Sequence, residues 1–191
     1  MSLSDKIWWT RKSRIQTEKR LLSNDFQAQM ILLWYAFFSV AISIYYLIKK
    51  SDSDIAPGVW VILSVFSLTA STFVSALNFK SRALLVKECY EHLDALYQAV
   101  NHTTGSEKIN SIQIKYNETL SLCENHTELD YRSARCEMYF SGNRNFSPAI
   151  SRYEIANWLI SKTLRYILLA VIYTTPTVLF LILEVRNACT R

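Results

Sequence analysis

The stretch FQAQMILLWYAFFSVAISIYYLI, residues 26–48, contains 23 residues without a formal charge, and it decides the fold class. A second uncharged stretch of 25 residues, IAPGVWVILSVFSLTASTFVSALNF, follows at residues 55–79. A helix rises about 1.5 Å per residue, so either stretch can cross a hydrocarbon core of about 30 Å. A soluble domain of 191 residues could hardly enclose two helices that are apolar on every side. The sequence therefore predicts an all-α membrane protein with a two-span helical hairpin over residues 26–79.

The rest of the chain is organised around this hairpin. Residues 1–25 place apolar and charged side chains at helical spacing, which predicts an N-terminal amphipathic helix. Residues 80–165 show helical patterns separated by polar turns, which predicts a cytoplasmic helical region. A third uncharged stretch of 18 residues, Tyr166–Leu183, is at the lower length limit for a span, and Pro176 should kink it. We expect a third transmembrane helix and a short tail over residues 166–191.

Basic residues near the spans predict the orientation, because Lys and Arg tend to stay on the cytoplasmic side. In the hairpin loop, Lys49 and Lys50 are offset by two aspartates. We expect the N-terminus and residues 80–165 in the cytoplasm, with the hairpin tip outside. Much of the net charge of +5 lies beside the ends of the spans, where anionic lipid attracts it, and without a compact basic patch we expect no direct contact with nucleic acid. Six basic residues precede the first span: Lys6, Arg11, Lys12, Arg14, Lys19 and Arg20.

Small polar residues recur along the second predicted span at spacings of three and four, so on a helix they form one narrow stripe. The stripe consists of Ser64, Ser67, Ser71, Ser75 and Asn78. On the first span Ser39 and Ser43 lie one helical turn apart, and we expect them to face this stripe. Small hydroxyl residues allow helices to pack closely and to share hydrogen bonds, but they also suit the lining of a water-filled pore in an oligomer. The residues alone leave both interpretations open.

The sequence contains no pattern typical of an enzyme. Its three glycines belong to no phosphate-binding loop, and the nucleophile elbow Gly-x-Ser-x-Gly does not occur. Cys123, His126, Asp130 and Cys136 do not have the spacing of a standard zinc site, so we expect neither a metal nor a cofactor. The predicted spans hold no formal charge, which argues against a proton-coupled pump or a voltage sensor. We therefore expect no catalytic site.

Several short motifs, taken together, resemble one known family. Trp9-Thr-Arg-Lys-Ser-Arg-Ile and then Glu18-Lys-Arg-Leu lead directly into the hairpin, and Cys123-Glu-Asn-His-Thr-Glu-Leu-Asp-Tyr131 follows in the predicted cytoplasmic region. This arrangement resembles the SLATT family, the two-transmembrane effector domains associated with SMODS and SLOG proteins in bacterial conflict systems. The resemblance covers nearly the whole chain and points to the subfamily numbered five.

The resemblance, rather than composition or periodicity, implies an anti-phage effector of the bacterial inner membrane. Such an effector forms a homo-oligomeric pore, and it depolarises and kills the infected cell on an upstream signal. A neighbouring nucleotidyltransferase or reverse transcriptase, or its nucleotide product, would supply that signal. Cytoplasmic positive charges that could bind such a nucleotide are Arg132, Arg135 and Arg144. The alternative is a membrane-anchored scaffold that recruits partners through its cytoplasmic helices and conducts nothing.

Overall fold

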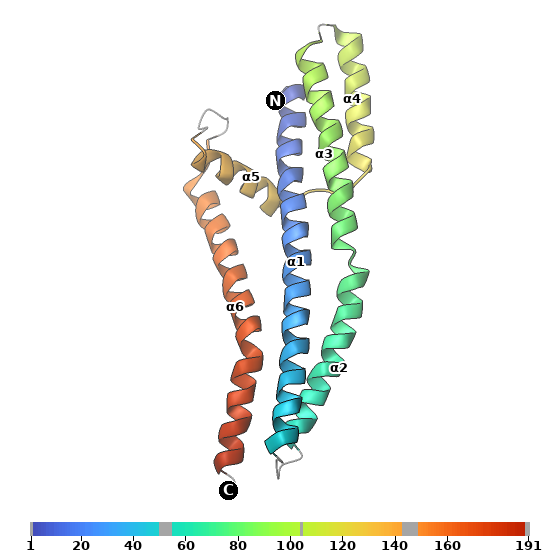
Figure 1. Cartoon of the computed structure of the whole chain (residues 1–191). Coiled ribbons are helices and arrows are strands. Elements are labelled where there is room, and N and C mark those ends of the chain that lie inside the picture. Colours follow the sequence, from blue (N-terminus) through green and yellow to red (C-terminus); the bar gives the residue numbers. More distant parts are fainter. Residues whose placement is uncertain (1, 50–54, 104, 143–148, 190–191) are drawn as a thin grey trace. The chain divides into compact units, whose positions relative to one another are not determined.

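The regular secondary structure is helical throughout the residues that the computed structural model describes, which are 2–49, 55–103, 105–142 and 149–189. Three segments are long and apolar enough to cross a membrane: Leu3–Lys49, Gly58–Asn101 and Arg152–Arg186. The all-α class predicted from the sequence is confirmed, as are three helices of sufficient length to span. The helices are α1 (Leu3–Lys49), α2 (Ile55–Ala76), α3 (Phe79–Asn101), α4 (Ser106–Ser121), α5 (Glu128–Phe140) and α6 (Arg152–Cys189) (Figure 1).

Contacts divide the chain into two compact units, each made from two separate stretches. We call Met1–Asp25 with Phe79–Ser161 the polar unit, and Phe26–Asn78 with Lys162–Arg191 the apolar unit. The helices α1 and α6 contribute to both units, because each begins with charged sequence and continues into an uncharged stretch. Each unit has a hydrophobic core of its own.

The break between α2 and α3 lies inside the second uncharged stretch of the sequence. α2 ends at Ala76, and Asn78 has a φ of 49°, in the left-handed region that asparagine enters more readily than most residues. The Asn78 side-chain amide donates to the Ala76 carbonyl at 3.2 Å and so satisfies an acceptor at the helix end. The 22 residues of α2 still reach across a hydrocarbon core of about 30 Å.

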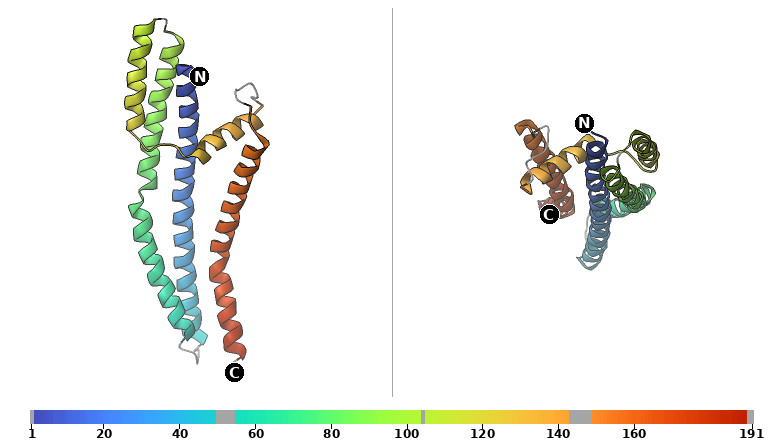
Figure 2. Two further views of the ribbon diagram at one scale, coloured as in Figure 1. Left: turned by 180° about the vertical axis from the view of Figure 1, so that it is seen from behind. Right: turned by 90° about the horizontal axis from the view of Figure 1, so that it is seen from above.

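The core of the polar unit lies where the first part of α1 packs against α3 and α4, which run side by side (Figure 2). Polar contacts flank this core. The hydroxyls of Thr10 and Tyr116 are hydrogen-bonded at 2.9 Å, and Arg11 forms an ion pair with Asp94 at 2.8 Å. Five buried residues from the three helices make up the core: Ile7, Cys89, Leu93, Ile112 and Tyr116.

A buried carboxylate attaches the beginning of α5 to α1. Asp130 accepts from the Thr127 backbone N–H at 2.9 Å, and its own N–H donates to the Thr127 hydroxyl, which forms a capping box. Arg20 donates to both carboxylate oxygens of Asp130, at 2.9 and 3.1 Å, and Thr17 donates at 3.1 Å. Burial raises the pKa of Asp130, but the hydrogen bonds from Arg20 and Thr127 outweigh it, so the net pKa lies below its ordinary value. Asp130 is therefore ionised in the folded chain.

We predict that Asp130→Ala lowers the free energy of unfolding of the polar unit by about 2 kcal/mol, because Arg20 and the first turn of α5 lose their buried acceptor. Hydrogen exchange of the α5 amides in the full chain measures this loss. Since the folded pKa of Asp130 is lowered, its stabilisation is complete above the ordinary pKa of 3.8 and disappears as the pH falls through the folded value.

The matched control for this prediction is Glu128→Ala, which removes the exposed partner of Arg132 in the same turn of α5. An exposed ion pair contributes about 0.5 kcal/mol or less, so this change should leave the exchange nearly unaltered. Equal effects of the two substitutions would contradict the role given to Asp130.

Candidate membrane-spanning site

The apolar unit is built around the second part of α1, which packs against both α2 and α6. Trp60 of α2 is 1% exposed and its ring centroid lies 5.9 Å from that of Phe38 on α1. Residues of α6 pack against Trp60 and Phe38 and complete one hydrophobic cluster. Its buried members are Ile42, Tyr46, Trp60 and Leu183.

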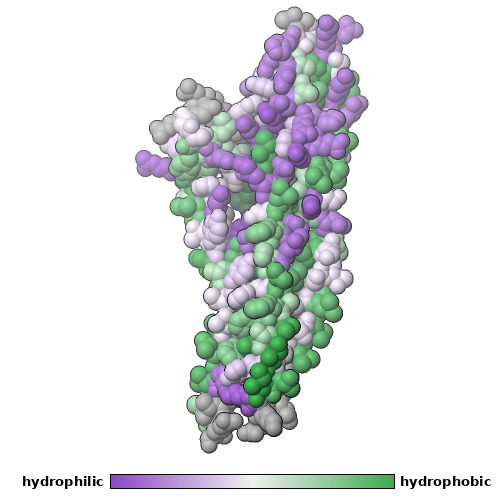
Figure 3. Space-filling model, in the orientation of Figure 1, coloured by the Kyte–Doolittle hydropathy of each residue, from purple (hydrophilic) through white to green (hydrophobic). Residues whose placement is uncertain are grey.

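Most of the surface of the spanning helices is left uncovered by the chain itself. In the most apolar window of each candidate span, only 17%, 11% and 11% of the residues are buried inside the chain. Large apolar side chains such as Phe37, Ile62 and Leu168 are exposed, and Figure 3 shows apolar surface over the spanning parts of the helices. A soluble protein rarely exposes so much apolar area, so lipid or further copies of the chain must cover it.

Pro176 creates the most specific polar arrangement in the apolar unit. Proline has no N–H, so the Ile172 carbonyl four residues earlier loses its intrahelical donor. The Tyr35 hydroxyl of α1 donates to this carbonyl at 2.9 Å, and the Trp34 indole N–H donates to the adjacent Tyr173 carbonyl at 3.1 Å. We call these two hydrogen bonds the proline clamp. They join α1 to α6 where the backbone of α6 lacks a partner of its own.

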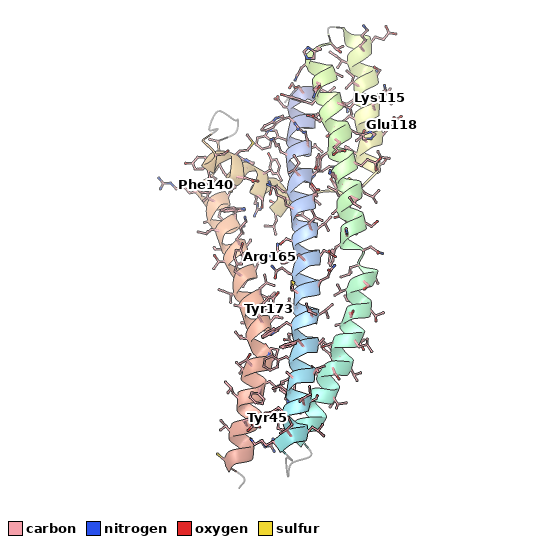
Figure 4. The ribbon with its side chains drawn as sticks, viewed as in Figure 1. Tyr45, Lys115, Glu118, Phe140, Arg165 and Tyr173 are labelled. Atoms are coloured by element: carbon pink, nitrogen blue, oxygen red, sulfur yellow. The ribbon has the colours of Figure 1, made fainter. Side chains whose placement is uncertain are left out.

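Two threonines and a glutamine extend the proline clamp. Thr174 and Thr175 donate back to the Val171 carbonyl at 3.1 and 2.7 Å, so the turn before Pro176 has side-chain donors at successive carbonyls. Tyr173 lies on α6 toward α1 (Figure 4), and its hydroxyl donates to the Gln27 side-chain oxygen at 3.2 Å. The polar side chains around Pro176 therefore satisfy one another and the backbone, as hydrocarbon requires.

An ion pair joins the ends of α1 and α6. The Lys49 ammonium lies 2.5 Å from the Glu184 carboxylate and donates to the Tyr45 hydroxyl at 2.9 Å. Tyr35 meets Ile172 and Lys49 meets Glu184, so the partner positions advance in the same direction along both helices. α1 and α6 are therefore parallel within the apolar unit, and the end of α6 lies beside the end of α1.

The seven predicted pore residues differ in burial. Ser39 and Ser67 are buried, at 2% and 9% exposed, and Ser71 is half-buried. Three hydroxyls bond to carbonyls of their own helix: Ser43 to Ser39, Ser64 to Val61, and Ser67 to Leu63, at 2.7, 2.7 and 2.9 Å. Exposed positions are Ser43, Ser64, Ser75 and Asn78.

The predicted nucleotide-binding arginines have other partners. Arg135 is 5% exposed, pairs with Glu154 at 2.6 Å and donates to the Ala149 carbonyl at 3.3 Å. Arg132 pairs with Glu128. Arg144 lies outside the described residues. In the described part of the chain, no cluster of three or more His, Cys, Asp or Glu side chains could hold a metal ion.

Sequence reasoning missed the proline clamp, although its elements were visible. Pro176 in an uncharged stretch leaves the carbonyl at position 172 without a donor, and Trp34 and Tyr35 each carry a donor that requires a partner in hydrocarbon. Pairing them required knowledge of which helices are neighbours and of their register, which composition does not supply.

The long apolar helices and their uncovered surface define a helical membrane protein. The family model described as SMODS and SLOG-associating 2TM effector domain family 5 matches residues 1–183, so the chain belongs to this family. The resemblance noted from the motifs is thereby confirmed. No curated protein and no solved structure matches the chain.

We predict that Tyr35→Phe lowers the free energy of unfolding by about 0.5 to 1.5 kcal/mol, the usual contribution of a hydrogen bond inside a membrane protein. Pro176→Ala restores an N–H at position 176 that can donate to Ile172. In that background the cost of Tyr35→Phe should fall to within about 0.3 kcal/mol of zero. A double-mutant cycle from denaturant unfolding in micelles measures the coupling.

Tyr45→Phe is the matched control for this cycle, because Tyr45 contacts Lys49 rather than the proline turn. The loss of unfolding free energy caused by Tyr45→Phe should be the same with proline or alanine at position 176. A cost of Tyr35→Phe that is independent of residue 176 would contradict the proline clamp.

Proposed function

We propose that this membrane effector oligomerises in the bacterial inner membrane and forms a pore that depolarises and kills the infected cell. Membership of an effector domain family associated with SMODS and SLOG proteins supports a role in conflict systems. The observation that carries the proposal is the uncovered surface of the three candidate spans, of which at most 17% of the window residues are buried within one chain. Such helices have most of their surface free for contact with further copies.

The exposed polar residues of α2 are the candidates for the pore lining. Ser64, Ser75 and Asn78 are exposed, and Ser71 is half-buried beside them on the same stripe. Small hydroxyl side chains that bond to their own helix backbone tolerate lipid in a closed state and water in an open one. Two of the predicted pore residues, Ser39 and Ser67, are buried within the apolar unit. We propose that they serve helix packing, or that they reach the pore only when the spans rearrange in an open state.

Two buried polar atoms favour the existence of a second arrangement of the spans. The Ser39 hydroxyl and the Trp60 indole N–H are buried and have no hydrogen-bond partner among the described residues. A polar group without a partner in an apolar interior costs about 1 to 3 kcal/mol. An oligomeric state that hydrates these atoms would recover this energy, which supports a closed chain that is poised to open.

We infer that the opening signal comes from a neighbouring nucleotidyltransferase or reverse transcriptase, or from its nucleotide product. The cytoplasmic helices would receive it. Arg132 and Arg144 remain candidate contacts for such a nucleotide, whereas Arg135 would first have to leave Glu154. The proposal involves no cofactor and no catalysis.

We predict that Ser64→Leu combined with Ser75→Leu abolishes killing of the host cell while membrane expression persists. Leucine removes the hydroxyls that would contact water and narrows a pore lined by α2. The measurement is colony survival after induction with the activating neighbours, together with immunoblots of the membrane fraction.

The matched control for this pair is Thr69→Leu. Thr69 is also exposed on α2 and bonds its own backbone, to Val65 at 3.0 Å, but it lies about 140° around the helix axis from Ser64. It should leave killing intact. Full killing by the serine double variant would show that the stripe does not line the pore. A chain that never alters the membrane potential would instead support the alternative, a non-conducting scaffold.

We further predict the orientation from the basic residues before the first span. A cysteine at position 52, in the hairpin loop predicted from the sequence, should react with an impermeant maleimide added outside spheroplasts, in a chain with its four native cysteines replaced. A cysteine at position 102, after α3, should react only after permeabilisation. The reverse pattern would place the polar unit outside the cell.

A further inference from the structure

Two cysteines of the polar unit share one buried arginine. Nη1 of Arg14, on α1, donates to the sulfur atoms of both Cys89 on α3 and Cys123 after α4. Its Nη2 donates to the Leu120 carbonyl at 3.2 Å, and the Cys89 thiol donates to the Thr119 carbonyl at 3.1 Å. Because one nitrogen reaches both sulfurs, the two thiols are close neighbours although 34 positions separate them in the chain.

The charge of Arg14 makes this pair more than a packing contact. Its side chain is 1% exposed, a guanidinium does not lose its proton, and no carboxylate among the described residues lies within ion-pair distance. A buried cation without an anion is expensive, and Arg14 donates to both sulfurs, so it stabilises negative charge that forms on either sulfur during a reaction. Burial raises the pKa of Cys89 to about 12 despite the opposing charge of Arg14. Cys123, which is partly exposed, is therefore the sulfur that a reagent meets first.

We propose that Cys89 and Cys123 form a dithiol that hydrogen peroxide oxidises reversibly to a disulfide, and that Arg14 promotes this reaction. The Cys123 thiol loses its proton and its sulfur attacks one peroxide oxygen, the O–O bond breaks, and the hydroxide that leaves takes up a proton to become water. The Cys89 thiol then loses its proton and attacks the sulfenic sulfur, which releases a second water and forms the S–S bond. Peroxide is reduced by two electrons, and the two thiols are oxidised.

Oxidation also changes the environment of Arg14. A disulfide cannot carry negative charge and is a poor acceptor, so the guanidinium retains only the Leu120 carbonyl. A buried cation that loses its acceptors weakens the packing of the first part of α1 against α3 and α4. α1 continues as one helix from Arg14 to Lys49, so this packing change occurs in the same helix that forms the first candidate span.

The test uses the full chain in bacterial membranes exposed to hydrogen peroxide, followed by alkylation of free thiols, digestion and mass spectrometry. We expect a peptide linked through Cys89 and Cys123 that disappears with dithiothreitol, while buried Cys136 on α5 stays alkylatable after unfolding. Arg14→Gln should slow disulfide formation at least about tenfold, since the attacking sulfur loses the cation that stabilises its developing negative charge. In Cys89→Ser, dimedone should trap Cys123 as the sulfenic acid.

Hydrogen exchange of residues 7–21 gives a second readout, and it should increase at least about threefold when the disulfide forms. Exposed Cys189 reports that the peroxide dose was effective. If Cys189 is oxidised while Cys89 and Cys123 can still be alkylated, the proposal is overturned. A linked peptide without faster hydrogen exchange in residues 7–21 would overturn the claim that oxidation weakens the packing of α1. Both readouts are independent of conduction, so they can fail or succeed whatever the fate of the proposed pore.

Discussion

A helix in hydrocarbon has to satisfy its own backbone, and Pro176 prevents α6 from doing so. The proline clamp resolves this constraint, because Tyr35 and Trp34 of α1 donate to the carbonyls at positions 172 and 173. The same contacts fix the register and the parallel direction of α1 and α6. The ion pair of Lys49 with Glu184 is consistent with that register, and Trp60 of α2 packs against Phe38 of α1. α1 is thus the common partner of both other spanning helices.

The first part of the same helix organises the polar unit through its basic residues. Arg11 pairs with Asp94, Arg14 reaches the two thiols, and Arg20 holds Asp130 at the beginning of α5. Charges that the sequence presents as an orientation signal are therefore also attachments between elements. A positive residue before a span can serve both purposes, since the topological rule counts basic residues rather than net charge.

The sequence predicted the helical class and the spans because long uncharged stretches allow few other structures. It did not predict the break at Asn78, which depends on one left-handed backbone conformation. Burial varies along the predicted site: Ser39 is buried, whereas Ser43, one turn later on the same face of α1, is exposed. Likewise, charge alone makes Arg135 a candidate for binding a nucleotide, and its partner Glu154 cannot be identified without the fold. The family motifs were readable directly from the sequence.

The apolar unit of one chain has satisfied polar groups along its proline clamp but leaves most of its surface uncovered, and this contrast underlies the proposed pore. The most direct test is the membrane potential of bacteria that express the chain with and without its genomic neighbours, followed with a voltage-sensitive dye during phage infection. The account predicts depolarisation before lysis only when the chain and its activating neighbours are both present. A steady potential under those conditions, with the chain abundant in the inner membrane, would contradict it.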